Sequence, residues 1–207
     1  MKLFNAIAFS ILAAAALWIS GASPSVAEPV EYQIDPAHTQ IMFKVKHLGI
    51  STVTGRFDNF EGAYTFDPEN LANSGVVVTI KAASINTNEA KRDKHLKSED
   101  FLNVEKHPDI TFVSKGVLRD DKDDPDDYTI VGDLTINGVT KTVELEAEYG
   151  GKTTDPWGNE RTAFEAEAEI YRKDFNINWN KTLDSGGFVV GDKVKILLEV
   201  EGIHKKQ

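Results

Sequence analysis

Apolar and polar residues alternate along most of this chain. Ile41, Phe43 and Val45 share one parity, and Lys44 and Lys46 share the other. Because successive side chains of a β-strand point to opposite faces, this pattern predicts a strand that is dry on one face and wet on the other. The same pattern recurs at 76–80, 134–136, 143–149, 164–170, 175–179 and 194–200. The chain is therefore predicted to be mainly β.

Turn residues separate these predicted strands. Asn137-Gly138 lies between two alternating segments, and both residue types tolerate positive φ, which predicts a tight hairpin. Gly191-Asp192 predicts another tight turn, and Gly150-Gly151 together with 156–159 predicts a longer reversal. Eight or more antiparallel strands in one chain indicate a barrel or a sandwich.

One segment, 87–102, lacks alternation and is rich in helix formers. Thr87 or Asn88 is expected to cap a helix there, and Ser98 is expected to begin a second short helical turn. We therefore predict a short helical insertion at about residues 87–104, over one end of the sheet.

The first 27 residues have the features of a secretory signal peptide. A positive start at Lys2 precedes an apolar run at 6–19, and small residues lead up to Ala27. We predict cleavage after Ala27, an exported mature domain at 28–207, and no stable membrane insertion afterwards. The chain has no cysteine, which excludes disulfides and thiol catalysis.

The charges and histidines indicate what the chain does not bind. Its formal net charge is −10, and an acidic surface repels phosphate backbones, so no nucleic-acid partner is expected. The acidic run at 119–127 lacks the glycine and glutamate of a calcium loop, which favours a solvated loop. His38 and His47 lie too far apart on an extended strand to share an ion, and no G-x-S-x-G motif is present. No metal, cofactor or catalytic residue is predicted.

Two features leave alternatives open. The basic segment 91–97 is either a solvated helix face or a cationic rim for an anionic head group. The aromatic residues on the dry strand faces either fill an ordinary core or line a channel, because an eight-stranded barrel is just filled or just able to hold one small ligand.

Several motifs occur in order over the mature chain. They are Asp35-Pro-Ala-His38, Gly55-x-Phe57, Arg92-Asp-Lys-His95-Leu96, Pro108-x-Ile110-x-Phe112, Gly132-x-Leu134, Arg172-Lys-Asp174-Phe175 and Val190-Gly191-Asp192. Together they resemble the YceI-like family, the polyisoprenoid-binding or lipid-binding domains of bacterial envelopes. The resemblance implies an eight-stranded antiparallel, lipocalin-like barrel with an apolar channel for a polyisoprenoid or other long-chain lipid. It implies no catalytic residue. The chain departs from the family at Asn176, where glycine is usual.

From parity and this resemblance we expect a periplasmic protein, not an enzyme, that holds a lipid tail inside a barrel. The expected channel lining is Phe43, Val45, Phe57, Phe60, Phe112, Phe164, Ala166, Phe175 and Trp179, and the expected head-group contacts are Arg92, His95 and Lys97. Two alternatives stay open: an enzyme acting on a lipid or quinone-like substrate in the same cavity, and a stress-response structural protein with a filled barrel. A homodimer is also left open.

Overall fold

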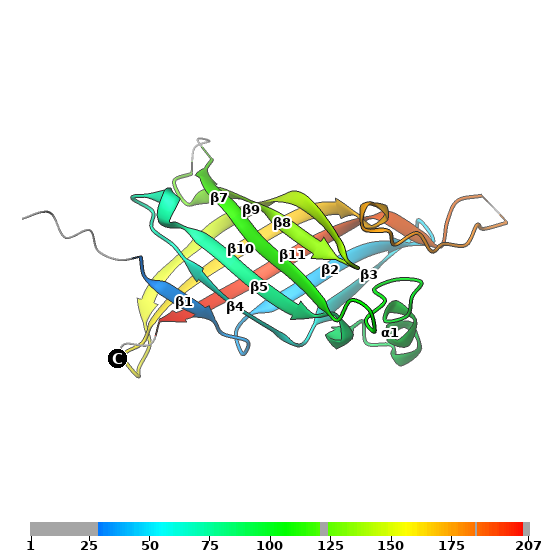
Figure 1. Ribbon diagram of the computed structural model, residues 1–207, viewed down its shortest axis with the longest axis horizontal. Helices are drawn as coiled ribbons and strands as arrows, with labels where there is room; N and C mark the ends of the chain where they lie inside the picture. Colours follow the sequence, from blue (N-terminus) through cyan, green and yellow to red (C-terminus); the bar gives the residue numbers. More distant parts are fainter. Residues whose placement is uncertain (1–28, 121–123, 185, 205–207) are drawn as a thin grey trace, which may run out of the picture.

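The computed structural model describes residues 29–120, 124–184 and 186–204. The predicted signal peptide and its cleavage site at Ala27 lie outside these ranges. Within them the chain forms an elongated barrel of antiparallel strands (Figure 1). The strands are β1 (Glu31–Ile34), β2 (Gln40–His47), β3 (Ser51–Phe57), β4 (Phe60–Thr65), β5 (Gly75–Lys81), β6 (Ile85–Asn86), β7 (Asp109–Arg119), β8 (Asp127–Ile136), β9 (Val139–Thr154), β10 (Glu160–Tyr171) and β11 (Val190–His204).

These strands occupy eight positions in the wall, because three positions are each shared by two collinear strands. β1 and β2 share one, β3 and β4 the next, and β5 and β6 a third, as their pairings show. β11 pairs with β10 along one edge and with both β1 and β2 along the other, which closes the sheet. The prediction of an eight-stranded antiparallel barrel is confirmed.

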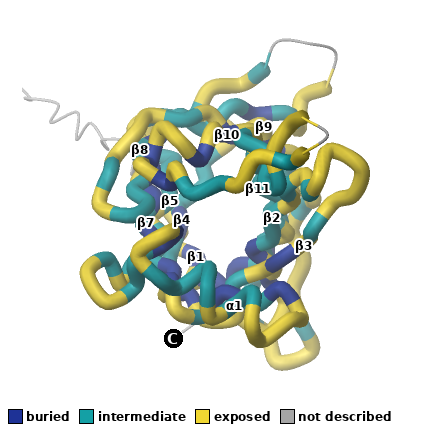
Figure 2. Tube along the Cα trace, turned by 90° about the vertical axis from the view of Figure 1, so that its right-hand side faces the viewer, coloured by how far each residue is buried: buried dark blue, intermediate teal, exposed yellow. Residues whose placement is uncertain are grey.

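The helical segments are short and lie at or near the barrel ends. They are α1 (Ala90–Leu96) and the 3-10 turns η1 (Leu71–Asn73), η2 (Ala82–Ser84) and η3 (Arg172–Phe175). Figure 2 looks onto the end that carries α1, and the helix lies along one side of the ring of strands. No helix in the described ranges is both long and apolar enough to cross a bilayer.

The helical insertion was predicted in the right place, but its capping residues were not. Glu89 caps α1, since its carboxylate accepts hydrogen bonds from the backbone N–H groups of Lys91 at 3.2 Å and Arg92 at 2.7 Å. Thr87 instead donates its hydroxyl to Asp93, and Ser98 begins hydrogen-bonded turns without a second helix. A glutamate reaches the first turn because its longer side chain folds back, which simple capping preferences do not anticipate.

The tight hairpin at Asn137-Gly138 is confirmed, with φ of 50° and 73° and Ile136 paired with Val139. The longer reversal is confirmed at 156–159, which lies between β9 and β10, but the predictions that the chain turns at Gly150-Gly151 and at Gly191-Asp192 were wrong. Gly150 lies inside β9, opposite a register shift at Ala163, and Gly191 lies inside β11, at a second register shift. An extra residue at such a bulge bends a strand without ending it, so glycine there marks a change of twist.

The prediction of a strand at 175–179 was also wrong. This segment begins at the last residue of η3 and leaves the sheet. Its carbonyl groups accept hydrogen bonds from the buried Arg172 guanidinium instead of from a neighbouring strand. Arg172 donates to the carbonyl oxygens of Ile177 at 2.7 Å and Trp179 at 2.8 Å. Phe175 and Ile177 remain buried, so the alternation reports which side chains face inward although the backbone is irregular.

Asn176 ends η3 in the left-handed conformation, with φ of 59°. Asparagine is one of the few L-residues that tolerates this region, which explains how the chain departs from the family's glycine there.

We predict that Asn176→Val lowers the free energy of unfolding by about 1–2 kcal/mol, because a β-branched residue strains this conformation. Asn176→Gly should be near neutral, since relief of backbone strain is offset by a more flexible unfolded chain. Urea unfolding of both variants measures this, and a valine variant as stable as the wild type contradicts it.

Candidate functional site

A cavity of about 560 Å³ runs inside the barrel. Its wall combines the inward faces of the strands with residues of α1 and of the segment after η3. At one end the wall includes His47 and Lys91, and at the other it includes Phe66 and Tyr128. The volume falls within the roughly 300–1,000 Å³ typical of small-molecule sites. Between its two ends the wall is almost entirely apolar, as the strand parity predicts.

Ten of the twelve residues predicted for the site lie in this wall. They are Phe43, Val45, Phe57, Phe112, Phe164, Ala166, Phe175, Trp179, Arg92 and His95. Phe60 is buried in the core next to the break between β3 and β4, but it does not reach the cavity. Lys97 follows the last residue of α1, and helical spacing turns it away from the face that carries Arg92 and His95. Whether any of these residues binds a ligand stays a prediction.

Glycines in the wall create space for aromatic rings. Gly55 lies opposite Phe43 in the β2–β3 ladder, and a Cβ atom added at Gly55 would lie 2.3 Å from the Cζ atom of Phe43. Gly132 of β8 lies diagonally across from Phe112 of β7, and a Cβ atom added at Gly132 would lie 2.4 Å from the Cζ atom of Phe112. Each ring therefore lies across a glycine on the neighbouring strand, as aromatic residues do when they cover glycines in β-sheets. The rings cover the wall instead of filling the axis.

We predict that Gly55→Ala displaces the Phe43 ring and lowers the free energy of unfolding by about 1–3 kcal/mol, the usual cost of overpacking. Adding Phe43→Leu should recover part of that loss, because leucine lacks the ring that the new methyl group meets, whereas the contact with the Thr87 methyl group at 2.8 Å stays. Urea unfolding of the two single variants and the double variant gives the coupling free energy. Gly116→Ala is the matched control, since its added Cβ has nothing within 4 Å. Additive effects of the two substitutions would contradict this packing.

An aromatic cluster closes the end of the barrel that lies away from α1. Tyr32 stacks on Tyr64 with ring centroids 5.4 Å apart, and Phe66 contacts Tyr128, Tyr149 and Phe164 at 4.9–5.2 Å. The Tyr64 hydroxyl forms a 2.5 Å hydrogen bond with the Thr162 hydroxyl, and burial raises the pKa of Tyr64 to about 12. This end is therefore filled by rings, and Tyr64 keeps its proton at neutral pH.

The opposite end, next to α1, is the polar end of the cavity. We call it the mouth and define it by Lys46, His47, Lys91, Arg92 and His95, all of which line the cavity. Strand parity placed Lys46 on the outer face, but at the end of a strand both faces border the opening. Lys46 and His47 were thus missed, and Lys91 was seen only as part of a basic segment.

Hydrogen bonds and ring contacts fix the two predicted head-group residues that reach the mouth. Arg92 donates from Nε to the Thr87 hydroxyl at 2.7 Å and from Nη2 to the Thr87 carbonyl at 2.8 Å. His95 lies 2.8 Å from an Asp100 carboxylate oxygen and makes edge contacts with Phe101 and Trp179. The Trp179 contact holds α1 against the segment after η3, and the others join α1 to the residues that flank it in the chain. Arg92 still has Nη1 without a recorded partner among the described residues.

A second polar cluster lies at the corner between β1 and β2. Asp35, His38 and Glu201 offer ligand atoms within 4.8 Å of one another, which is the spacing of a metal site. Arg161 already occupies it: its Nη1 donates to Asp35 at 2.8 Å and also to Glu201, and its Nε donates to Asp155 at 3.0 Å. Because guanidinium keeps its charge, a metal ion would have to displace it. The cluster therefore ties the Asp35–His38 turn to β10 and β11, as expected for a structural histidine.

This network also sets a pH dependence. Hydrogen bonds from Arg161 and His38 lower the pKa of Asp35 to about 2. At Asp155, desolvation raises the pKa, but hydrogen bonds from Asn159 and Arg161 outweigh it and lower the value to about 2. A carboxylate with a lowered folded-state pKa stabilises the fold above its ordinary pKa of about 4, and that stabilisation disappears as the pH falls towards 2.

We predict that Arg161→Met lowers the free energy of unfolding at neutral pH and that the difference from the wild type narrows as the pH falls from about 4 to 2. Thermal unfolding followed over this pH range measures the effect. Lys193→Met is the control, because it removes an exposed ion pair with Glu169 and should change little. A pH-independent difference between Arg161→Met and the wild type would show that the carboxylates are not coupled to Arg161.

This chain is similar in sequence and in fold to proteins that are already known. The YceI-like domain profile matches residues 32–202. The protein YceI of Escherichia coli is 47% identical over 186 residues, which cover 89% of this chain and 92% of the relative. BcnA of Burkholderia cenocepacia matches with a TM-score of 0.71 at 23% identity, covering 81% of this chain and 98% of its own. A polyisoprenoid binding domain from Saccharophagus degradans matches with a TM-score of 0.60 at 12% identity, covering 85% and 99%.

Proposed function

This chain belongs to the YceI-like domain family, and on that basis we propose that it is a periplasmic carrier of a polyisoprenoid or other long-chain amphiphilic lipid. The observation that carries the proposal is the apolar cavity of about 560 Å³, with rings at one end and cationic side chains at the other. The Saccharophagus degradans neighbour is a polyisoprenoid binding domain on the same fold, so this barrel shape is compatible with such a cargo.

In the proposed complex the lipid tail lies along the apolar wall and the head group stays at the mouth. Each buried methylene contributes about 0.8 kcal/mol, so a long tail needs no polar contact inside the barrel to bind tightly. Lys46, Lys91 and the Nη1 atom of Arg92 are the cationic groups available to an anionic head group such as a phosphate.

The cavity weighs against a barrel filled by its own side chains, since its volume is that of a ligand site. The positions of the ionisable side chains favour binding over catalysis. Those in the cavity wall lie at the mouth or in the aromatic cluster, apart from Arg172. The Arg172 guanidinium donates its hydrogen bonds to backbone carbonyl oxygens. Between the mouth and the aromatic cluster, where a lipid tail would lie, the wall is apolar except for Thr39, whose hydroxyl is bonded to the backbone of Glu201.

We predict that Ala166→Trp weakens binding of a long-chain prenyl alcohol by at least about tenfold, because Ala166 lines the cavity and the indole would occupy the tail's path. Glu165→Trp is the matched control, since the neighbouring side chain is exposed on the outer face of the same strand. Native mass spectrometry of protein purified from the envelope, with titration of the prenyl alcohol and its monophosphate, measures both occupancy and affinity. If the wild type yields no stoichiometric lipid and binds neither probe, the proposal is wrong.

A further inference from the structure

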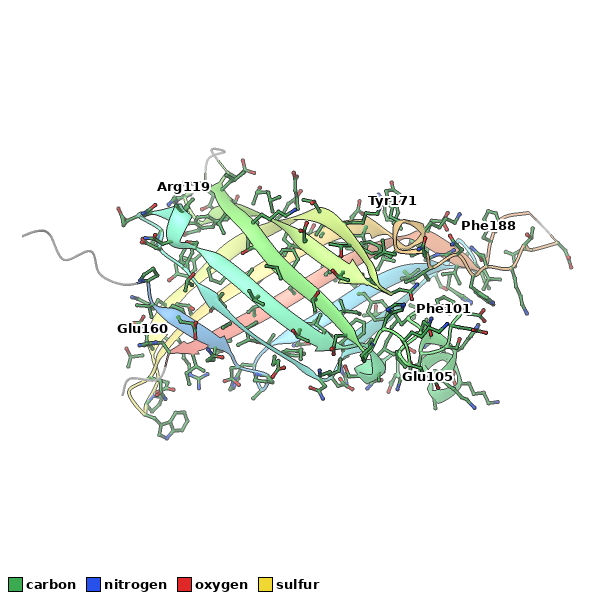
Figure 3. The ribbon with its side chains drawn as sticks, viewed as in Figure 1. Phe101, Glu105, Arg119, Glu160, Tyr171 and Phe188 are labelled. Carbon is green, nitrogen blue, oxygen red and sulfur yellow. The ribbon has the colours of Figure 1, made fainter. Side chains whose placement is uncertain are left out.

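Large apolar side chains are exposed around the mouth, on two loops that touch. Ile50 is 86% exposed and Leu48 37% exposed at the tip of the β2–β3 hairpin, and Phe188 is 55% exposed just before β11. The backbone N–H of Leu48 donates to the carbonyl of Val189 at 2.9 Å, which joins the two loops. Figure 3 shows Phe188 at the same end of the barrel as Phe101. These side chains project into solvent next to the opening, where they contribute little to the core.

The charges at this end differ from those of the chain as a whole. Lys46, Lys91, Lys94 and Lys181 are exposed, and none of them takes part in the ion pairs formed among the described residues. Four of the nearby acidic groups are engaged inside the protein: Glu89 caps α1, Asp93 accepts from Thr87, Asp100 contacts His95, and Asp192 pairs with Arg172 and Lys173. Four others at this end are exposed, namely Glu99, Glu105, Asp174 and Asp184. The chain as a whole has a net charge of −10, whereas at this end unpaired lysines nearly balance the acidic side chains.

Other exposed apolar side chains lack this combination. Trp157 is 80% exposed, but it lies in the β9–β10 turn beside Asp155, at the end that the aromatic cluster closes. Leu118 is 58% exposed near the end of β7, and Val77 and Val113 form a pair on the outer wall. Apolar tips, unpaired lysines and the opening of the cavity occur together at the mouth.

We propose that the mouth docks on the surface of an anionic lipid bilayer, with Ile50 and Phe188 entering the interface and the lysines meeting the head groups. The inference builds on the proposed lipid-carrier function, because this orientation turns the cavity towards the bilayer. A lipid tail could then pass between bilayer and barrel with little exposure to water. The acidic remainder of the chain is repelled by the same surface, so the charge distribution selects this orientation.

The interactions are those of a peripheral protein. Apolar side chains that enter the head-group region gain the free energy of leaving water, and each lysine near an anionic surface adds an attraction that salt screens. Because only a few apolar tips are present, the docking is reversible, which a carrier requires.

The test is co-flotation with vesicles of phosphatidylcholine, either alone or mixed with phosphatidylglycerol. We expect the wild type to float with the anionic vesicles and to dissociate when ionic strength rises from about 0.1 to 1 M, which shortens the Debye length from about 10 to 3 Å. Ile50→Ser with Phe188→Ser should weaken partitioning at least about tenfold, since burial of either side chain is worth such a factor. Lys91→Glu with Lys94→Glu should abolish the preference for anionic vesicles.

Trp157→Ser is the matched control: it removes an equally exposed ring from the opposite end and should leave flotation unchanged. Flotation that is absent in the wild type, or equal in all variants, overturns the proposal. So does a change of subunit number in the Ile50/Phe188 double variant by analytical ultracentrifugation, which would make the mouth an interface between copies of the chain.

Binding of prenyl alcohol delivered in detergent separates this inference from the proposed function. The Ile50/Phe188 double variant should retain that binding, because neither side chain lines the cavity. A wild type that binds the solubilised lipid and does not float contradicts the docking alone. A wild type that floats and binds no prenyl lipid supports the docking and contradicts the carrier function.

Discussion

The structure depends on the closure of its sheet by β11. This strand pairs with β10 along one edge and with β2 and β1 along the other, so the wall becomes continuous around the axis. A closed sheet of eight positions has a nearly fixed radius, and its interior volume is then set by the side chains that point inward. With no cysteine to link the strands, backbone hydrogen bonds and packing hold this closure. Glycines such as Gly55, which let rings lie against the wall, then help decide that the axis stays open.

The two ends of the barrel are built by different means. One end is closed by aromatic rings on regular strands, with Tyr64 and Thr162 joined by a hydrogen bond. The mouth combines the end of β2 with two segments outside the sheet, α1 and the segment after η3, whose backbone groups are satisfied by side chains such as Glu89 and Arg172. Because these segments lie outside the sheet, they can carry charged and exposed residues that strand interiors would not accommodate. The proposed lipid selection and membrane docking therefore both belong to the mouth.

Strand parity predicted the inward face of the wall in the middle of the barrel and failed near its ends. Phe43, Phe112 and Ala166 reach the cavity as their positions in alternating segments indicate. Parity failed for Lys46, which reaches the opening from the outer face. It also assigned 175–179 to a strand, although Arg172 holds this segment outside the sheet. Parity describes which face of a strand a side chain occupies. It does not apply at the rim of the barrel, where both faces border the opening, or where a side chain such as Arg172 takes the place of a neighbouring strand as hydrogen-bond partner.

The sequence by itself determined the local features: the alternating segments, the hairpin at Asn137-Gly138, the place of the helical insertion and most of the apolar wall. Each follows from residues near one another in the chain, through side-chain alternation or turn preference. Only the tertiary structure decided which end is closed and which is open. That outcome depends on contacts between distant segments, such as Tyr32 with Tyr64, Arg161 with Asp35 and Leu48 with Val189. No local pattern encodes them, because they exist only after closure brings opposite ends of the chain to the same part of the barrel.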